Sequence, residues 1–301
     1  MKISITFLGT GAVVPTLTRN HTAILLKYKN EDILIDCGEG TQRQFRKAKL
    51  NPCRLTKILI THWHGDHVLG LPGLFQTLAL NGYKKTLEVY GPKGTKIYIK
   101  EILKSFVPTK KIKMNVYEVT GGTFIKNSDF KITSFVLNNH PPTNGYLFEE
   151  LSKIRIDKFK LKKLKLNREE QTKLSELTKG KNIRINNKLI KAKDFTYKQK
   201  AKKISFILDT KLCASAKKLA KDSDLTIIES TYANEESAIA SEYGHLTAGQ
   251  AAEIAKQAKV KQLILTHFSQ RYEHKEDMLL KQAQKIFKNT KLAEDLMSVE
   301  V

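Results

Sequence analysis

The sequence predicts an α/β protein, and three observations support this fold class. Short segments with the apolar pattern of β-strands are followed by segments with the pattern of amphipathic helices, and this order repeats along most of the 301 residues. Hydrophobic residues make up 41% of the chain, which is close to the usual globular fraction and sufficient for a large core. No short repeat period appears. We therefore expect one sizeable domain or two small ones.

The predicted strands are rich in β-branched and other apolar residues, and polar segments separate them. They cover residues 3–8, 22–28, 33–35, 57–61, 87–90, 115–119, 131–136, 204–208, 225–229 and 262–266. The predicted helices have the period of an amphipathic helix and cover residues 41–49, 69–80, 95–106, 212–221, 248–258 and 278–287. Thr247 and Gln250 form a capping box at the start of the helix 248–258.

Cysteine content and hydropathy predict a cytoplasmic protein. Cys37, Cys53 and Cys213 are odd in number and widely spaced, so neither a disulfide framework nor a CxxC zinc knuckle is expected. No segment is a long uncharged apolar run of the kind that a membrane helix requires. The first eight residues alternate like a strand, which is not the pattern of a signal peptide.

The net charge indicates a polyanionic partner. The chain has 53 Lys and Arg residues against 30 Asp and Glu residues, which gives a net charge of +23. Positive charge of this size attracts nucleic acid through counterion release. A lysine-rich bias of the whole proteome is the alternative explanation, because Lys greatly outnumbers Arg.

One segment, residues 149–203, holds about half of this excess. It has 19 Lys or Arg and 7 Asp or Glu, a net of +12, with few aromatic residues and weak periodicity. A solvated charged loop or helical pair is the common explanation of such a run. Its position between two segments with metal-ligand candidates favours a functional insertion beside an active site.

The motif His-x-His-x-Asp-His at residues 62–67 predicts a metal site. Three imidazoles and a carboxylate within six residues are costly to bury without partners, and they follow a predicted strand. His62 and His64 are two residues apart, so they can approach one metal ion from the same side of an extended segment. Asp66 and His67 lie around the following turn and can serve a second ion.

Three single residues can complete two coordination spheres. His140 lies in a polar break after an apolar strand, Asp209 follows the strand 204–208, and His267 follows the strand 262–266. For each of them, an ordinary turn residue or a helix cap is the alternative explanation. Because each one follows a β-run, we expect all three at one edge of the sheets.

The order of these motifs resembles that of the ribonuclease Z family, over nearly the whole chain except the basic segment and the last turns. The resemblance rests on Phe-Leu-Gly-Thr-Gly at 7–11, Asp-Cys-Gly-Glu-Gly-Thr-Gln at 36–42, the histidine motif, His140, Asp-Thr at 209–210, His-Leu-Thr at 245–247 and Thr-His-Phe-Ser-Gln-Arg-Tyr at 266–272. The histidine motif marks the metallo-β-lactamase superfamily as a whole. The segments 36–42, 245–247 and 268–272 are more specific to ribonuclease Z.

The resemblance implies a single metallo-β-lactamase-type domain over residues 1–301, folded as an αββα sandwich with the basic arm 149–203 inserted. It also implies two Zn²⁺ ions per subunit at one edge of the sandwich. Mn²⁺ or Fe²⁺ is chemically compatible with the same ligands. The implied ligands are His62, His64 and His140 for one ion and Asp66, His67 and His267 for the other, with Asp209 as the bridge.

The implied reaction is phosphodiester hydrolysis that removes the 3′ trailer of precursor tRNA and leaves a 3′-hydroxyl on the tRNA. Asp66 would accept the proton of the attacking water, as proposed for the family. His245 stands two residues before a capped helix N-terminus and would donate a proton to the leaving oxygen. Glu229 would hold His245 in its charged form. Asp36 would support the histidine loop, although an ordinary strand-end turn explains it nearly as well.

The basic arm resembles, in position and charge, the flexible arm with which ribonuclease Z binds the elbow of tRNA across a homodimer. Lysines there would contact phosphates without reading sequence, so folded RNA would be recognised by its shape. The arm lacks the family's Gly-Pro motif, and the loop 15–20 lacks the lysine of Pro-x-Lys-x-Arg-Asn. The residues expected to contact substrate are Arg19, Arg271, Lys158, Lys160, Lys162, Lys163 and Lys165.

Two other functions are compatible with the motifs. A related metal-dependent phosphodiesterase would act on other RNA, DNA or small diesters, but the basic arm argues against it. A catalytically inactive RNA-binding relative is the non-enzymatic alternative, and the presence of every ligand position argues against that. His245 has an alternative as a helix-flanking residue without a chemical role, and His21 and His274 are expected to be structural.

Overall fold

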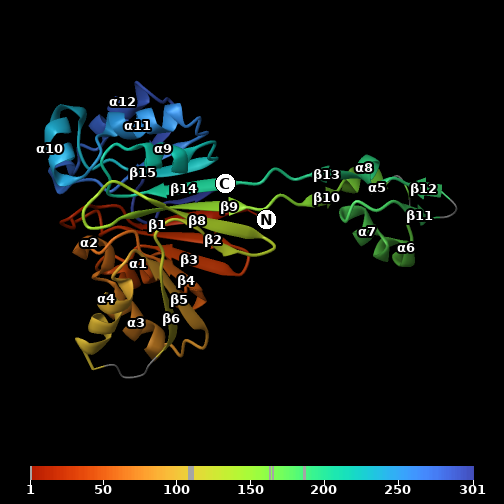
Figure 1. Cartoon of the computed structure of the whole chain (residues 1–301), viewed down its shortest axis with the longest axis horizontal. Helices are drawn as coiled ribbons and strands as arrows, with labels where there is room; N and C mark the ends of the chain where they lie inside the picture. The colour runs from red at the N-terminus through yellow and green to blue at the C-terminus, as the bar shows by residue number, and fades with distance from the viewer. Residues whose placement is uncertain (1, 108–111, 163, 165, 186–187) are drawn as a thin grey trace. The chain divides into compact units, whose positions relative to one another are not determined.

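The computed structural model describes residues 2–107, 112–162, 164, 166–185 and 188–301. The chain forms two compact units (Figure 1). The first, which we call the body, comprises Met1–Lys126, Lys131–Phe148 and Lys203–Val301. The second, which we call the arm, comprises Asn127–Phe130 and Glu149–Lys202. Within the described residues, no helix is long and apolar enough to cross a membrane.

In the part of the chain that the structure describes, the first sheet of the body has seven strands. In spatial order they are β18 (Ser298–Glu300), β1 (Ser4–Gly9), β2 (Ala23–Tyr28), β3 (Glu31–Ile35), β4 (Lys57–Leu59), β5 (Thr86–Gly91) and β6 (Lys113–Glu118). Neighbours from β18 to β3 are antiparallel, whereas β3 to β6 are parallel. The parallel strands β3 and β4 end at the same edge, so the loops that carry Asp36 and the histidine motif meet there.

The second sheet also has seven strands among the described residues. In spatial order they are β17 (Thr290–Leu292), β16 (Leu263–Thr266), β15 (Leu225–Glu229), β14 (Lys203–Ile207), β9 (Asn144–Glu150), β8 (Phe130–Val136) and β7 (Gly122–Lys126). Strands β14 to β17 are parallel, and β7 and β8 form an antiparallel pair. Asp209, Glu229 and His267 therefore lie at the common carboxyl end of three neighbouring parallel strands.

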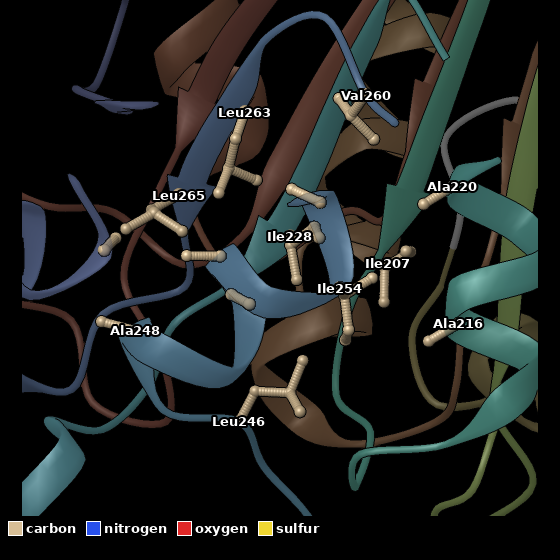
Figure 2. Close-up of a cluster of buried hydrophobic side chains, with 14 of the residues drawn as sticks. Ile207, Ala216, Ala220, Ile228, Leu246, Ala248, Ile254, Val260, Leu263 and Leu265 are labelled. Atoms are coloured by element: carbon tan, nitrogen blue, oxygen red, sulfur yellow. The ribbon is translucent and has the colours of Figure 1, made fainter. Parts of the chain in front are cut away.

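Helices cover the outer face of each sheet, so the predicted αββα sandwich is confirmed (Figure 1). The helices α1 (Thr41–Lys47), α3 (Leu71–Leu80) and α4 (Thr95–Lys104) pack on the first sheet through one buried apolar cluster. The helices α9 (Ala214–Ala220), α11 (Ala248–Gln257) and α12 (Asp277–Gln284) pack on the second sheet. Figure 2 shows Ile254 of α11 close to Ile207 and Ile228 of the strands beneath it.

Aromatic side chains join the two sheets across the middle of the sandwich. Tyr28 of β2 meets Phe148 of β9 edge to face, with ring centroids 5.4 Å apart. The Tyr146 hydroxyl donates a hydrogen bond to the Ile60 carbonyl at 2.6 Å. Burial of a Phe side chain contributes roughly 1.5–3 kcal/mol to stability. These contacts hold the two sheets together and so set the distance between the strand ends that carry the site.

The arm consists of short elements around a small core. Strand β10 (Ile154–Ile156) pairs with β13 (Thr196–Lys198), and β11 (Ile183–Ile185) pairs with β12 (Lys188–Ile190). Its helices are α5 (Lys158–Lys162), α6 (Arg168–Thr172), α7 (Leu174–Thr178) and α8 (Ala192–Phe195). The buried core consists of Leu177, Ile183, Ile185, Ile190 and Ala192. Lys163 and Lys165 lie outside the described residues.

The predicted strands and helices are all present, with bounds that differ by a few residues. The capping box of Thr247 and Gln250 is confirmed by hydrogen bonds in both directions. The strands β7, β9, β17 and β18 of the body and β10 to β13 of the arm were not predicted. Strand β9 begins with Asn144 and Gly145, which are turn-forming residues, and burial between neighbouring strands overrides that local preference.

Candidate metal centre

Three predicted site residues lie just past strand ends in a left-handed backbone conformation. Asp36 follows β3 with φ 56°, Asp209 follows β14 with φ 41°, and His267 follows β16 with φ 61°. This conformation is costly for residues other than glycine and concentrates at functional sites. The turns direct the side chains of Asp209 and His267 toward each other, so that Asp209 Oδ1 and His267 Nε2 are 3.2 Å apart.

The histidine motif begins shortly after β4 and continues into the short helix α2 (Gly65–Val68). The turn that follows β3 packs closely against it. His62 and His67 are fully buried, Asp66 is buried, and His64 is exposed. A Cβ atom on Gly38 would lie only 2.5 Å from the Asp66 carbonyl oxygen, so a larger residue does not fit there. This close approach holds the histidine loop against the turn that follows β3.

Four donor atoms face one point. The Nε2 atoms of His67 and His267 are 3.1 Å apart. Asp209 Oδ1 is 3.3 Å and 3.2 Å from these two nitrogens, and Asp66 Oδ2 is 3.5 Å and 3.3 Å from them. Ligand atoms held about 2.0–2.2 Å from one tetrahedral zinc ion lie roughly 3.3 Å from each other. The four atoms therefore have the spacing of a metal coordination sphere.

A second group of donors lies on the other side of Asp209. His62 Nε2 is 2.9 Å from His64 Nδ1 and 3.4 Å from Asp209 Oδ2. Asp209 thus presents one oxygen to each group, which is the position of a bridging carboxylate. His140 is exposed in the segment between β8 and β9, and among the described residues this group contains only His62, His64 and Asp209.

The remaining ring nitrogens of the buried histidines bond away from the donor groups. His67 Nδ1 donates to Asp36 Oδ2 at 2.6 Å. His62 Nδ1 lies 3.1 Å from Thr61 Oγ1, and the Thr61 hydroxyl donates to the same Asp36 oxygen at 2.7 Å. His267 Nδ1 lies 2.9 Å from a threonine hydroxyl. With Nδ1 protonated, each Nε2 lone pair points inward, as in metal-ligating histidines.

The buried charge of the site also fits a divalent cation. Asp36, Asp66 and Asp209 are three buried carboxylates, and Asp209 Oδ1 has no hydrogen-bond partner among the described residues. Burial lowers the pKa of His67, but the neighbouring carboxylates more than offset this effect and raise it well above its usual value. Without a metal ion, a proton on His67 supplies the positive charge that these carboxylates favour. A divalent cation at the same place would supply that charge instead.

His245 and Glu229 lie beside the donor groups. His245 is in the turn between α10 (Ser237–Tyr243) and α11, and its Nδ1 is 3.2 Å from Glu229 Oε2 and 3.9 Å from Asp209 Oδ2. Burial lowers the pKa of His245, but Glu229 and Asp209 more than offset this and raise it to about 9. The imidazole therefore carries a proton at neutral pH and is able to donate it.

The two arginines that were expected to contact substrate have intramolecular partners. Arg19 is 11% exposed, its Nε donates to Glu276 at 2.6 Å, and its Nη1 donates to the Thr10 hydroxyl and the Ala293 carbonyl. Arg19 therefore holds the N-terminal loop in place, contrary to the prediction that it presents its guanidinium to substrate. Arg271 is 42% exposed, pairs with Glu236 and lies over the Tyr232 ring, 5.1 Å from its centroid.

The lysines predicted to contact substrate lie on α5 of the arm. The side chains of Lys158, Lys160 and Lys162 are exposed. Lys158 and Lys162 border a hollow of about 380 Å³ that three leucine side chains also line. Lys160 Nζ donates a hydrogen bond to the Asp194 carbonyl at 2.9 Å, which ties α5 to α8.

Three contacts of the site were not predicted from the sequence. The hydroxyls of Thr61 and Thr231 bond to buried histidines of the two donor groups, and the backbone N–H of Val13 donates to Asp66 Oδ2 at 2.8 Å. A hydroxyl close to a strand-end ligand is the only sequence signal for the threonines. No signal exists for Val13, because a backbone amide donates whatever its side chain.

The chain resembles known proteins over nearly its whole length. Residues 3–138 match the family model described as Anti-Pycsar protein Apyc1, and residues 168–268 match the beta-lactamase superfamily domain. The chain is 39% identical to a ribonuclease Z of Methanothermobacter thermautotrophicus, with 99% of this chain and 97% of that protein covered. It is 38% identical to a ribonuclease Z of Bacillus cereus, with 98% of each covered. The crystal structure of human tRNase Z, short form, has a TM-score of 0.69 and 29% identity, with 98% of each chain covered.

Proposed function

This chain belongs to the ribonuclease Z family of the β-lactamase superfamily and is a metal-dependent endoribonuclease of tRNA 3′ processing, and we propose that it cuts at a two-zinc centre. One observation carries the proposal. Asp209 presents one carboxylate oxygen to His62 and the other to His67 and His267, so a single buried side chain links two donor groups. Two metal ions joined by a carboxylate are a recurring arrangement for cutting phosphodiesters.

The proposed ligands follow from the two donor groups and the family pattern. One ion would be held by His62, His64 and Asp209, with His140 added from the family pattern, and the other would be held by Asp66, His67, His267 and Asp209. Imidazole and carboxylate donors suit Zn²⁺, and Mn²⁺ or Fe²⁺ can occupy the same set. When bound, the two ions supply Lewis-acid stabilisation of phosphate charge and a water activated for attack.

The chain's own residues handle the protons of the reaction. The Asp66 carboxylate, which is ionised at neutral pH, accepts the proton of the attacking water. As the bond between phosphorus and the 3′-oxygen breaks, His245 donates its proton to that oxygen, which becomes the 3′-hydroxyl of the tRNA. The phosphate stays on the 5′ end of the trailer. Glu229 keeps His245 protonated until that step.

The arm is proposed to bind the folded part of precursor tRNA. Its exposed lysines Lys158, Lys160 and Lys162, together with Lys163 and Lys165, would contact phosphates and attract RNA through counterion release. Arg271 at the body would contact substrate once its pairing with Glu236 is exchanged for a phosphate. Recognition of this kind depends on shape and charge and not on base sequence.

The assembly and location of the protein are also part of the proposal. A homodimer follows the family pattern, in which the arm of one subunit serves the active site of the other. A cytoplasmic location follows from the substrate and from Cys37, Cys53 and Cys213, which are all free thiols. Sedimentation of the purified protein tests the dimer directly, because a monomer at micromolar concentration would contradict it.

The decisive experiment uses a 5′-labelled precursor tRNA with a 3′ trailer. The protein is stripped with chelator and then reloaded with two equivalents of Zn²⁺ or Mn²⁺. We expect a single cut after the discriminator base, a 3′-hydroxyl on the tRNA, and no cut in the Asp66→Ala variant. If the protein binds two metal ions but cuts only small diesters, the tRNA substrate is wrong and the phosphodiesterase alternative replaces it.

A further inference from the structure

Thr231 occupies the centre of a buried network beside the metal centre. It follows the end of β15 by two residues and is 1% exposed. Its hydroxyl oxygen lies 2.6 Å from Glu229 Oε2, 2.9 Å from His267 Nδ1 and 3.3 Å from His245 Nδ1. One hydroxyl therefore contacts a proposed metal ligand, the proposed proton donor and the carboxylate between them.

The direction of these hydrogen bonds follows from the chemistry of the groups. A hydroxyl has one hydrogen, and the Glu229 carboxylate at 2.6 Å is its nearest and strongest acceptor. Thr231 Oγ1 must then accept the hydrogen on His267 Nδ1. This fixes the His267 tautomer, so that its Nε2 lone pair faces Asp66 and Asp209.

Glu229 connects the same threonine to two further parts of the site. Its Oε1 accepts the backbone N–H of Thr210 at 2.9 Å, and Thr210 is the residue next to the bridging Asp209. His245 Nδ1 is 3.2 Å from Oε2 and 3.3 Å from Oε1 of the same carboxylate. Glu229 is fully buried, so these interactions are not weakened by water.

The first sheet contains a matching pair. There Thr61 donates to Asp36 at 2.7 Å and lies 3.1 Å from His62 Nδ1, just as Thr231 donates to Glu229 and contacts His267 Nδ1. Each sheet thus supplies one threonine and one buried carboxylate that orient an imidazole. Only the pair in the second sheet also contacts His245.

We propose that Thr231 is a positioning residue that ties the metal ligand His267 and the proton donor His245 to one carboxylate, Glu229. Metal binding and placement of the proton donor are therefore coupled through one hydroxyl. The proposal rests on the two-metal site described above. Loss of the hydroxyl would leave His267 Nδ1 without an acceptor and free its ring to adopt the other tautomer, which presents a hydrogen to the metal.

The test measures metal affinity in the full-length protein by competition between a chromophoric chelator and Zn²⁺, and by the visible absorption of bound Co²⁺. We expect Thr231→Val to weaken binding at one of the two sites about 10- to 100-fold, as outer partners of histidine ligands do in other proteins. Thr231→Ser keeps the hydroxyl and should bind both ions within about threefold of wild type. The Co²⁺ spectrum should change in Thr231→Val only.

Two control variants separate this role from general damage to the fold. Thr226→Val removes a buried hydroxyl from β15, the strand that precedes Thr231, where it accepts a hydrogen bond from Ser205 at 2.8 Å, so it should lower thermal stability without changing metal affinity. His245→Ala should reduce kcat and leave metal affinity unchanged. At saturating metal, Thr231→Val should still have a reduced kcat with little change in KM.

The outcomes distinguish this inference from the proposed function. If wild-type protein binds fewer than two Co²⁺ ions, the two-metal site fails and the role of Thr231 fails with it. If wild type binds two ions and a folded Thr231→Val variant binds them equally well, only the role of Thr231 is wrong. Equal weakening in Thr226→Val would also refute it, because the effect would then come from the strand and not from the hydroxyl.

Discussion

The body and the arm differ in how firmly they hold their functional residues. In the body, the side chains of His62, His67 and His267 are 0% exposed, and each is oriented by a second hydrogen bond. In the arm, the helix α5 that carries the lysines proposed to contact substrate has no buried residue among those described. The arm core consists of a few side chains, whereas two large clusters support the sheets of the body.

This difference follows from what each unit has to do. Hydrolysis of a phosphodiester requires donor atoms placed to within about 0.5 Å, and such placement needs packed strands and outer hydrogen bonds. Attraction of phosphates requires only charge at a surface, because Coulomb forces act over roughly 8–10 Å at physiological salt. Residues 149–203 supply that charge with a net of +12. Precise geometry and surface charge are therefore assigned to separate units of one chain.

The largest expected effect comes from removing Asp209, which lies between the two donor groups of the body, and this change should leave the arm intact. Asp209→Ala should lower kcat/KM for precursor tRNA roughly 10³-fold or more, because metal ions supply several kcal/mol of transition-state stabilisation. Affinity for precursor tRNA, measured by filter binding at fixed salt, should stay within about threefold. A large loss of tRNA affinity would show that the body, and not the arm, carries most of the binding.

Deletion of residues 153–202 makes the opposite change, because it removes the arm and keeps the donor groups of the body. Glu150 N donates to Lys202 O at 2.8 Å, so a short glycine-serine linker can rejoin the ends of the deletion. We expect tRNA affinity to fall about 10- to 100-fold and the dependence of log K on log salt to become shallower. Hydrolysis of bis(p-nitrophenyl) phosphate should remain within about threefold of wild type. Unchanged tRNA cleavage would remove the arm from substrate binding.

A third prediction concerns the proton donor of the body. The pKa of His245 is raised to about 9, so its acidic form is present below that pH and is lost as the pH rises through it. Burial lowers this pKa, and Glu229 is the largest influence that raises it. In Glu229→Gln, the alkaline limb of kcat/KM should therefore move to lower pH. An alkaline limb at the wild-type position would show that His245 is not the group that titrates.

The smallest expected effect comes from single lysines of the arm. Lys158→Ala, Lys160→Ala and Lys162→Ala should each weaken tRNA binding by less than about 1 kcal/mol and reduce the salt slope by about one or less. The losses should be similar for different tRNAs, since phosphate contacts do not read sequence. A single lysine that accounted for most of the affinity, or for one tRNA only, would show a specific pocket instead of a diffuse charged surface.

Much of the fold was predictable because the signals are local. The strand that precedes the histidine motif and the strands that precede Asp209 and His267 are short apolar runs, and the capping residue Thr247 marks the start of α11. Strands β9 and β18 could not be predicted, because Asn144 and Gly145 favour a turn and Ser298–Glu300 is too short for a period. Pairing with distant strands, and not local preference, makes these segments extended.

The sequence by itself determined the chemistry of this protein. The histidine motif, the strand-end aspartates and the basic segment predict metal ligands and a polyanionic substrate, because these residue types are unfavourable without such partners. Only the tertiary structure decided how the groups meet. His67 and His267 are 200 positions apart, yet their Nε2 atoms lie 3.1 Å from each other. The burial of Arg19 and the position of Asp209 between the two donor groups likewise arise from contacts between distant segments, and no local pattern encodes which segments will touch.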